Sequence, residues 1–182
     1  MNNVFVLTLD EREGQQAATL RDAAWELETL FSMIPGTEEF REELRRLYPG
    51  GTCYAWCLWD VSKDMKAAWD GMEKGDLLLG YRNRSIMFAS FILLKANGPF
   101  PALRLQDVHA EGSPEVICFT DKPHVGEVPI IPQMSRYLDE EYLGLTKLED
   151  ANVMNILSDY GSLDTFVHLC LRYDFPFSLR HS

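Results

Sequence analysis

Long hydrophobic runs are missing from this 182-residue sequence, and their absence limits the class of protein. The longest apolar stretches are short, such as "VFVL" near the start and "FILL" at residues 91–94. A helix that crosses a membrane needs about 20 consecutive apolar residues. The opening stretch "MNNVFVLTLDE" has neither a basic region nor a long apolar core, so it is unlike a secretory signal. We therefore expect a cytoplasmic protein with no membrane partner.

Cysteine and histidine are scarce, with four of each. The cysteines Cys53, Cys57, Cys118 and Cys170 are too few for a disulfide framework at this length, which favours a reducing compartment. Cys53 and Cys57 have no second pair of ligands in the sequence, so we expect no metal and no other cofactor. His168 and Cys170 are close in sequence, but we interpret them as packing residues of one helix rather than as a catalytic pair.

The motifs that mark common enzymes are also missing. The sequence has no phosphate-binding Gly-x-x-x-x-Gly-Lys loop, no Gly-x-Gly-x-x-Gly, no His-Glu-x-x-His and no Gly-x-Ser-x-Gly. Its many carboxylates follow predicted helix faces, where a solvated surface is the ordinary interpretation. We therefore predict a binding domain and not an enzyme.

Net positive charge is present in only one part of the chain. The whole sequence is net −11, which argues against a general nucleic-acid binder, because phosphate contacts depend on Lys and Arg. Residues 54–105 are the exception, with 7 basic and 5 acidic side chains. A small local excess of this kind also arises by chance.

The hydrophobic periodicity predicts an α+β fold. Short strands are expected at 4–9, 52–59, 77–81, 86–94, 115–119 and 127–131, and helices at 14–31, 37–47, 62–72, 148–160 and 162–173. The helices at about 14–48 form an insertion, and those at about 148–173 close the chain. Five or six short strands with helices around them suggest a small, closed or half-closed β-barrel. We predict one domain over residues 1–182.

One aromatic-rich stretch carries a further pattern. A strand with Trp56 and Trp59 is followed by a helix, by the turn Lys74-Gly75-Asp76, and by a hairpin "YRNRSIMFAS" at residues 81–90. This order resembles the EVE and YTH domains of the PUA-like superfamily. The tail "YLGLTKLEDANVMNILSDYG" is similar to the segment that follows such a domain in the N-terminal specificity modules of McrB-type restriction systems.

The resemblance implies a PUA-like barrel that reads a modified DNA base. Such a domain flips the base into an aromatic cage, and N6-methyladenine is the expected modification. Matching positions make Trp56 the first cage wall, with Trp59 as the alternative, and assign to the backbone carbonyl of Cys57 a contact with the methylated amine. Tyr81 and Phe119 are the candidates for the remaining walls.

The two arginines of the hairpin are candidate phosphate ligands. Arg82 and Arg84 lie at the turn, where they could contact the DNA backbone, and a solvated hairpin tip is the equally weighted alternative. The expected partners are methylated DNA and the motor and nuclease parts of a restriction complex, of which this chain is expected to be a fragment. Two other functions stay open: an RNA-binding PUA-like module, and a protein-interaction or small-ligand domain with no nucleic-acid role.

Overall fold

The computed structural model describes residues 2–9, 24–59, 61–103 and 113–171 and has the predicted α+β class. The chain divides into two compact units, each discontinuous in sequence. Unit 1 comprises Met1–Glu11, Lys63–Phe91 and Pro123–Ser182, and unit 2 comprises Arg12–Ser62 and Ile92–Lys122. Among the described residues, no helix is both long enough and apolar enough to cross a membrane.

Eight strands pair with one another in the described residues, in the order β2-β3-β6-β5-β4-β1-β8, and β7 also pairs with β5. Their bounds are β1 Val4–Thr8, β2 Ala24–Glu26, β3 Thr52–Leu58, β4 Leu77–Arg82, β5 Ser85–Asn97, β6 Val116–Thr120, β7 His124–Pro129 and β8 Leu145–Lys147. The β1–β4 pair is parallel and the other pairs are antiparallel.

The strand order in the described residues is open, so the closed form of the expected closed or half-closed barrel is wrong for this part of the chain. The two end strands, β2 and β8, have three residues each and do not pair with one another. Closure needs continuous hydrogen bonding between the first and last strands. The long strand β5 pairs with β4 and β7 through its first half in unit 1, and with β6 through its second half in unit 2.

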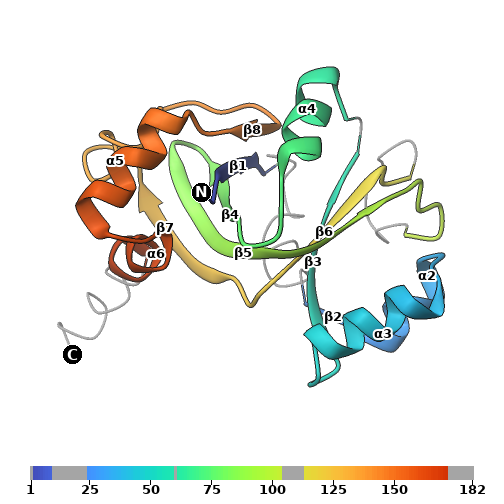
Figure 1. Cartoon of the computed structure of the whole chain (residues 1–182). Coiled ribbons are helices and arrows are strands. Elements are labelled where there is room, and N and C mark those ends of the chain that lie inside the picture. Colours follow the sequence, from blue (N-terminus) through green and yellow to red (C-terminus); the bar gives the residue numbers. More distant parts are fainter. Residues whose placement is uncertain (1, 10–23, 60, 104–112, 172–182) are drawn as a thin grey trace. The chain divides into compact units, whose positions relative to one another are not determined.

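In unit 1, helices α5 (Asp150–Tyr160) and α6 (Leu163–Leu171) cover one face of the β1–β4–β5 sheet. They lie next to one another, and α6 lies beside β7 (Figure 1). Side chains from both helices and from the strands share one apolar core: Val4, Val6, Leu77, Leu79, Ile86, Val153, Ile156, Phe166 and Val167. Gly161 separates the helices in the left-handed conformation, with φ 78°, as its position in the sequence predicts. Both predicted C-terminal helices are confirmed through residue 171.

The β4–β5 hairpin and helix α4 (Lys63–Gly71) form where the sequence predicts them. Gly80 and Phe88 lie opposite each other in the hairpin. A Cβ atom at Gly80 would overlap the ring of Phe88, which is fully buried. The strand therefore needs a residue without a side chain at this position.

Strands β1 and β4 are tied together at their starts by Asp76, the last residue of the "KGD" turn. The Asp76 side chain is 3% exposed, and its carboxylate accepts hydrogen bonds from the backbone N–H groups of Asn3 at 2.7 Å and Glu73 at 2.8 Å. A buried carboxylate is stable when its oxygens accept such bonds. Asp76 thus joins two segments that are 73 residues apart.

In unit 2, helices α2 (Leu27–Met33) and α3 (Glu38–Leu47) pack on the sheet formed by β2, β3, β6 and the second half of β5. The caps of α3 are as predicted: Thr37 accepts a hydrogen bond from the N–H of Phe40 at 3.3 Å, with acidic residues in the first turn and arginines in the last.

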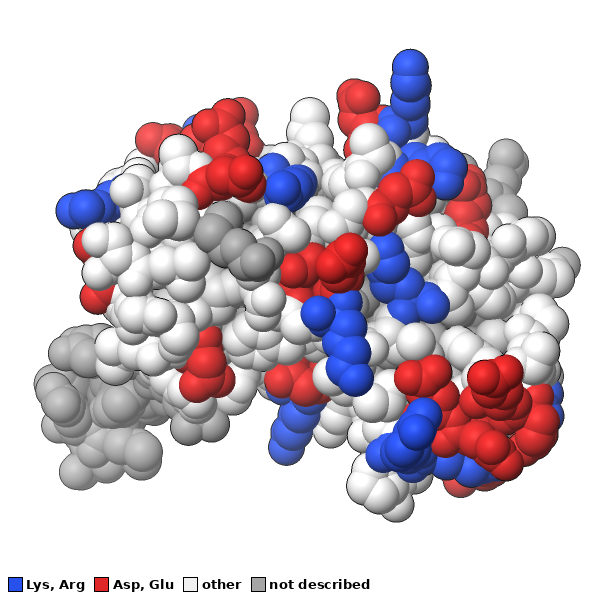
Figure 2. Space-filling view, in the orientation of Figure 1, with Lys and Arg blue, Asp and Glu red and all other residues white. Residues whose placement is uncertain are grey.

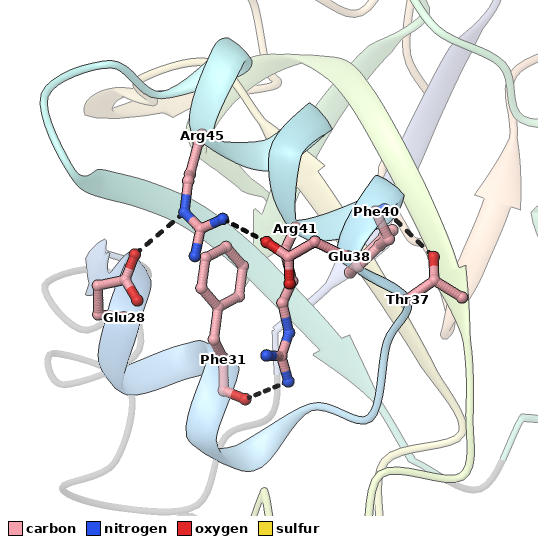
Figure 3. A network of polar contacts seen from close by, with 7 residues as sticks. All are labelled: Glu28, Phe31, Thr37, Glu38, Phe40, Arg41 and Arg45. Atoms are coloured by element: carbon pink, nitrogen blue, oxygen red, sulfur yellow. Dashed lines mark hydrogen bonds and ion pairs between the residues drawn. The ribbon is translucent and has the colours of Figure 1, made fainter.

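Arginines also join α2 to α3. The guanidinium of Arg45 bridges Glu28 and Glu38 over the ring of Phe31, and Arg41 approaches the same ring (Figure 3). The guanidinium-to-centroid distances are 5.0 Å for Arg45 and 5.6 Å for Arg41, which is within the range of a cation–π contact.

The predicted helical insertion is wrong at Ala24–Glu26, which forms strand β2. Trp25 pairs with Cys53 of β3, and the N–H of Leu27 donates to the carbonyl of Gly51 at 2.8 Å. The helical spacing of apolar residues reaches into this stretch, but pairing with a neighbouring strand determines its conformation. The earlier part of the predicted helix, residues 14–23, lies outside the described residues.

Candidate functional site

The end of strand β3 carries three of the predicted base-binding residues. Trp56 is 3% exposed, Cys57 is half-buried, and Trp59 is half-buried and follows directly after the last strand residue. A base stacks on an aromatic face only when that face is open to it. Trp59 therefore offers more accessible surface than Trp56 in this conformation.

The thiol of Cys57 is a neutral group. Burial raises its pKa to about 12, so the thiolate is not populated at physiological pH. A neutral thiol is a poor nucleophile and a poor metal ligand.

Phe119 lies in strand β6 and belongs to the core of unit 2. Its side chain is fully buried and packs edge-to-face on Phe40, with ring centroids 6.1 Å apart. The face of β3 that carries Ala55 joins the same core. A base could stack on Phe119 only if α3 side chains moved away from it.

Tyr81 lies in strand β4 and belongs to the core of unit 1. It is 7% exposed, its hydroxyl donates to the carbonyl of Glu140 at 2.9 Å, and its ring packs edge-to-face on Tyr142 at 5.5 Å. These contacts fix the ring and connect β4 to the segment before β8.

The hairpin tip holds the two arginines. Asn83 and Arg84 have φ values of 48° and 60°, the left-handed pair that a two-residue turn of the I′ type requires. Arg82 is half-buried at the end of β4, whereas Arg84 is exposed and forms an ion pair with Glu141 at 3.2 Å. The turn therefore directs one arginine side chain into solvent, as the predicted phosphate contact needs.

The seven predicted residues form two sets, one in each unit. Unit 2 holds the set at the end of β3 together with the buried Phe119, and unit 1 holds Tyr81 and the arginines. Both units are acidic: unit 1 has 9 basic and 15 acidic side chains, and unit 2 has 8 and 13. In unit 2 the charges over α2 and α3 are of both signs, with the acidic ones in excess (Figure 2).

The other polar side chains of interest contact one another in ways that suit a structural role. His168 Nε2 lies 3.5 Å from an Asp164 oxygen, and its ring packs edge-to-face on His124 at 5.5 Å. The Cys170 thiol lies 3.4 Å from the hydroxyl of Tyr160. The described residues include no cluster of three or more His, Cys, Asp or Glu side chains that could hold a metal ion.

Sequence reasoning missed two residues that shape the candidate site. The "KGD" motif identified a turn but not the two hydrogen bonds that its carboxylate accepts. Glu141 had no sequence signal at all, because it meets Arg84 across 57 residues of chain. Only the tertiary structure brings such pairs together.

Comparison with known proteins gives no match: no family model fits this chain, and neither a curated protein nor a solved structure is significantly similar to it.

Proposed function

We propose that this chain is a DNA-binding specificity domain that reads a modified base, with N6-methyladenine as the expected modification, in a restriction system of the McrB type. In this proposal the domain belongs to the PUA-like class and does no chemistry itself. GTP hydrolysis and DNA cleavage would be carried out by other parts of the complex.

The observation that carries the proposal is the order of elements from β3 to β5. Strand β3, which contains Trp56 and Cys57 and is followed at once by Trp59, precedes α4, the turn that Asp76 anchors and a hairpin tipped with Arg84. This order is the one in which the sequence resembles the EVE and YTH domains, and it is what supports the proposal. The order supplies Trp59 as a candidate stacking side chain and Arg84 as a candidate phosphate ligand.

Within this proposal Trp59 is the better candidate for the stacking wall. Stacking on an aromatic side chain contributes about 1–3 kcal/mol per base, which offsets much of the few kcal/mol that extrusion from a duplex costs. Trp59 is half-buried and retains some exposed surface, whereas Trp56 is almost completely covered. Burial of a methyl group adds about 0.8 kcal/mol, which provides the preference for the modified base.

The acidic charge sets an upper limit to the affinity. With −11 overall and an excess of acidic side chains in both units, the domain can make few phosphate contacts. We expect weak, salt-sensitive binding by the isolated chain. Several copies in one complex would raise the apparent affinity through avidity.

The direct test is a titration of the chain with matched duplexes that do and do not contain one N6-methyladenine. We expect tighter binding of the methylated duplex, and Trp59→Ala should weaken it by about 5–150-fold, the range that corresponds to the loss of one stacked base. Trp25→Ala is the matched control, since Trp25 is also half-buried and lies in unit 2. Equal affinity for both duplexes would sink the proposal.

Two further measurements distinguish the two other candidate functions from DNA binding. Matched RNA oligonucleotides report an RNA-binding module, which would depend on the 2′-hydroxyl. A protein-interaction or small-ligand role is favoured by the acidic charge of both units. It becomes the better explanation if no modified DNA or RNA shows salt-dependent binding.

A further inference from the structure

The ion pair between Arg84 and Glu141 joins the hairpin tip to an acidic loop of the same unit. Arg84 Nη2 lies 3.2 Å from Glu141 Oε1, and the two side chains are 63% and 77% exposed. The pair therefore occupies the outer surface of unit 1, at the arginine that the proposed function assigns to phosphate.

The backbone is fixed at the hairpin end of this pair. The carbonyl of Arg84 accepts a hydrogen bond from the N–H of Ile130 at 2.9 Å, and the paired strands β4 and β5 hold the two-residue turn. Arg84 therefore projects from a defined point.

The loop that carries Glu141 is anchored as well. The Tyr81 hydroxyl donates to the carbonyl of Glu140 at 2.9 Å, and the Tyr142 hydroxyl accepts the N–H of Asp139 at 2.8 Å. The Thr8 hydroxyl donates to the carbonyl of Tyr142 at 2.9 Å. Residues on both sides of Glu141 are thus held, so that the backbone position of Glu141 beside Arg84 is defined.

We propose that Glu141 is an internal competitor of nucleic-acid phosphate for Arg84. The inference rests on the proposed function and adds a means of regulating it. A carboxylate and a phosphate oxygen bind the same guanidinium donors, so a DNA strand that contacts Arg84 must displace Glu141. The competition lowers the affinity for every duplex. Because this cost applies equally to modified and unmodified DNA, it sets the strength of binding and leaves the preference for the modified base unchanged.

The test compares Glu141→Gln with Glu140→Gln. Both changes remove one negative charge, from neighbouring exposed residues, and the Glu140 contact to Tyr81 uses the backbone carbonyl and survives the substitution. Long-range attraction to DNA rises equally in both variants. Any difference between their affinities for DNA therefore reports the loss of the ion pair between Arg84 and Glu141. Exposed ion pairs of this kind correspond to about a 2–5-fold change in an equilibrium constant.

The probe is a short duplex with one N6-methyladenine at about 50 mM salt, where phosphate contacts are strong. We expect Glu141→Gln to bind it about 2–5-fold more tightly than Glu140→Gln. In an Arg84→Gln background the difference between the two glutamate variants should vanish. Unchanged circular dichroism and thermal midpoints would show that the fold is intact.

The outcomes separate the inference from the proposed function. If all variants bind the duplex and the two glutamate substitutions have the same effect, the inference is wrong and the proposed function stands. A difference that persists without the arginine side chain also overturns the inference. If neither the natural chain nor any variant binds DNA or RNA, the proposed function fails, and the inference fails with it.

Discussion

Replacement of Asp76 by alanine should be among the most destabilising single changes in unit 1. The carboxylate is 3% exposed and accepts two backbone hydrogen bonds, at 2.7 Å and 2.8 Å, from segments before β1 and before β4. Hydrogen bonds to a charged group contribute about 1.5–3 kcal/mol each. Removing both acceptors also leaves two N–H groups without their partner. We expect the free energy of unfolding to fall by about 3–5 kcal/mol, against the 5–15 kcal/mol that is typical of whole domains.

The loss can be measured by urea unfolding followed by circular dichroism. With a slope of about 2 kcal/mol per molar urea, the midpoint should fall by about 1.5–2.5 M. Asp76→Asn keeps one acceptor oxygen and should lose about half as much stability. The matched control is Asp70→Ala, which removes an exposed carboxylate that pairs with Lys66 at 3.3 Å on the neighbouring helix α4.

Asp70→Ala should lower the free energy of unfolding by about 0.3–0.5 kcal/mol, the ordinary value for an exposed ion pair one helical turn apart. Equal shifts of the urea midpoint in Asp76→Ala and Asp70→Ala would contradict a stabilising role of the two Asp76 hydrogen bonds. Such a result would mean that water satisfies the two N–H groups once the carboxylate is gone. The junction of β1 and β4 would then depend on the strand pairing alone.

Three other predictions follow from single residues. Gly80→Ala should lower the free energy of unfolding by about 1–3 kcal/mol, because the new methyl overlaps the ring of Phe88, whereas Gly71→Ala meets no atom within 4 Å and should be close to neutral in the same denaturation assay. Arg84→Gly should raise the thermal midpoint through a gain of about 0.5–1 kcal/mol in the free energy of unfolding, since glycine adopts positive φ without strain. The same change should weaken DNA binding. A lower thermal midpoint would contradict the turn assignment. Burial raises the pKa of Cys53 to about 11, so its thiol should react slowly with alkylating reagents at pH 8 and rapidly once the chain is unfolded, and fast labelling of the folded chain would argue against this burial.

Much of the local structure follows from the sequence alone. The helix α3 begins after Thr37 and carries its charges at the predicted ends. The apolar runs on either side of "RNRS" form the antiparallel pair β4–β5, and Gly161 ends α5. These features depend on neighbours within a few residues, where helical and strand periodicities and capping rules apply directly.

The sequence was a poorer guide where distant segments meet. Trp25 falls within the predicted helix at residues 14–31 but lies in a strand, because pairing with Cys53 of β3 determines its conformation. The sequence also could not show which of Trp56 and Trp59 is accessible to a base. Alternation along a strand separates their faces, but only packing shows that Trp56 is covered and that Trp59 retains exposed surface.

The α+β class, the hairpin with its two arginines and the positions of most helices could be predicted from the sequence, because they follow from contacts between near neighbours in the chain. The open strand order in the described residues and the hydrogen bond from Asn3 to Asp76 are visible only in the folded chain. The ion pair between Glu141 and Arg84 is likewise visible only there. Each of these depends on residues many tens of positions apart, whose meeting is set by the packing of the whole unit and by no local pattern.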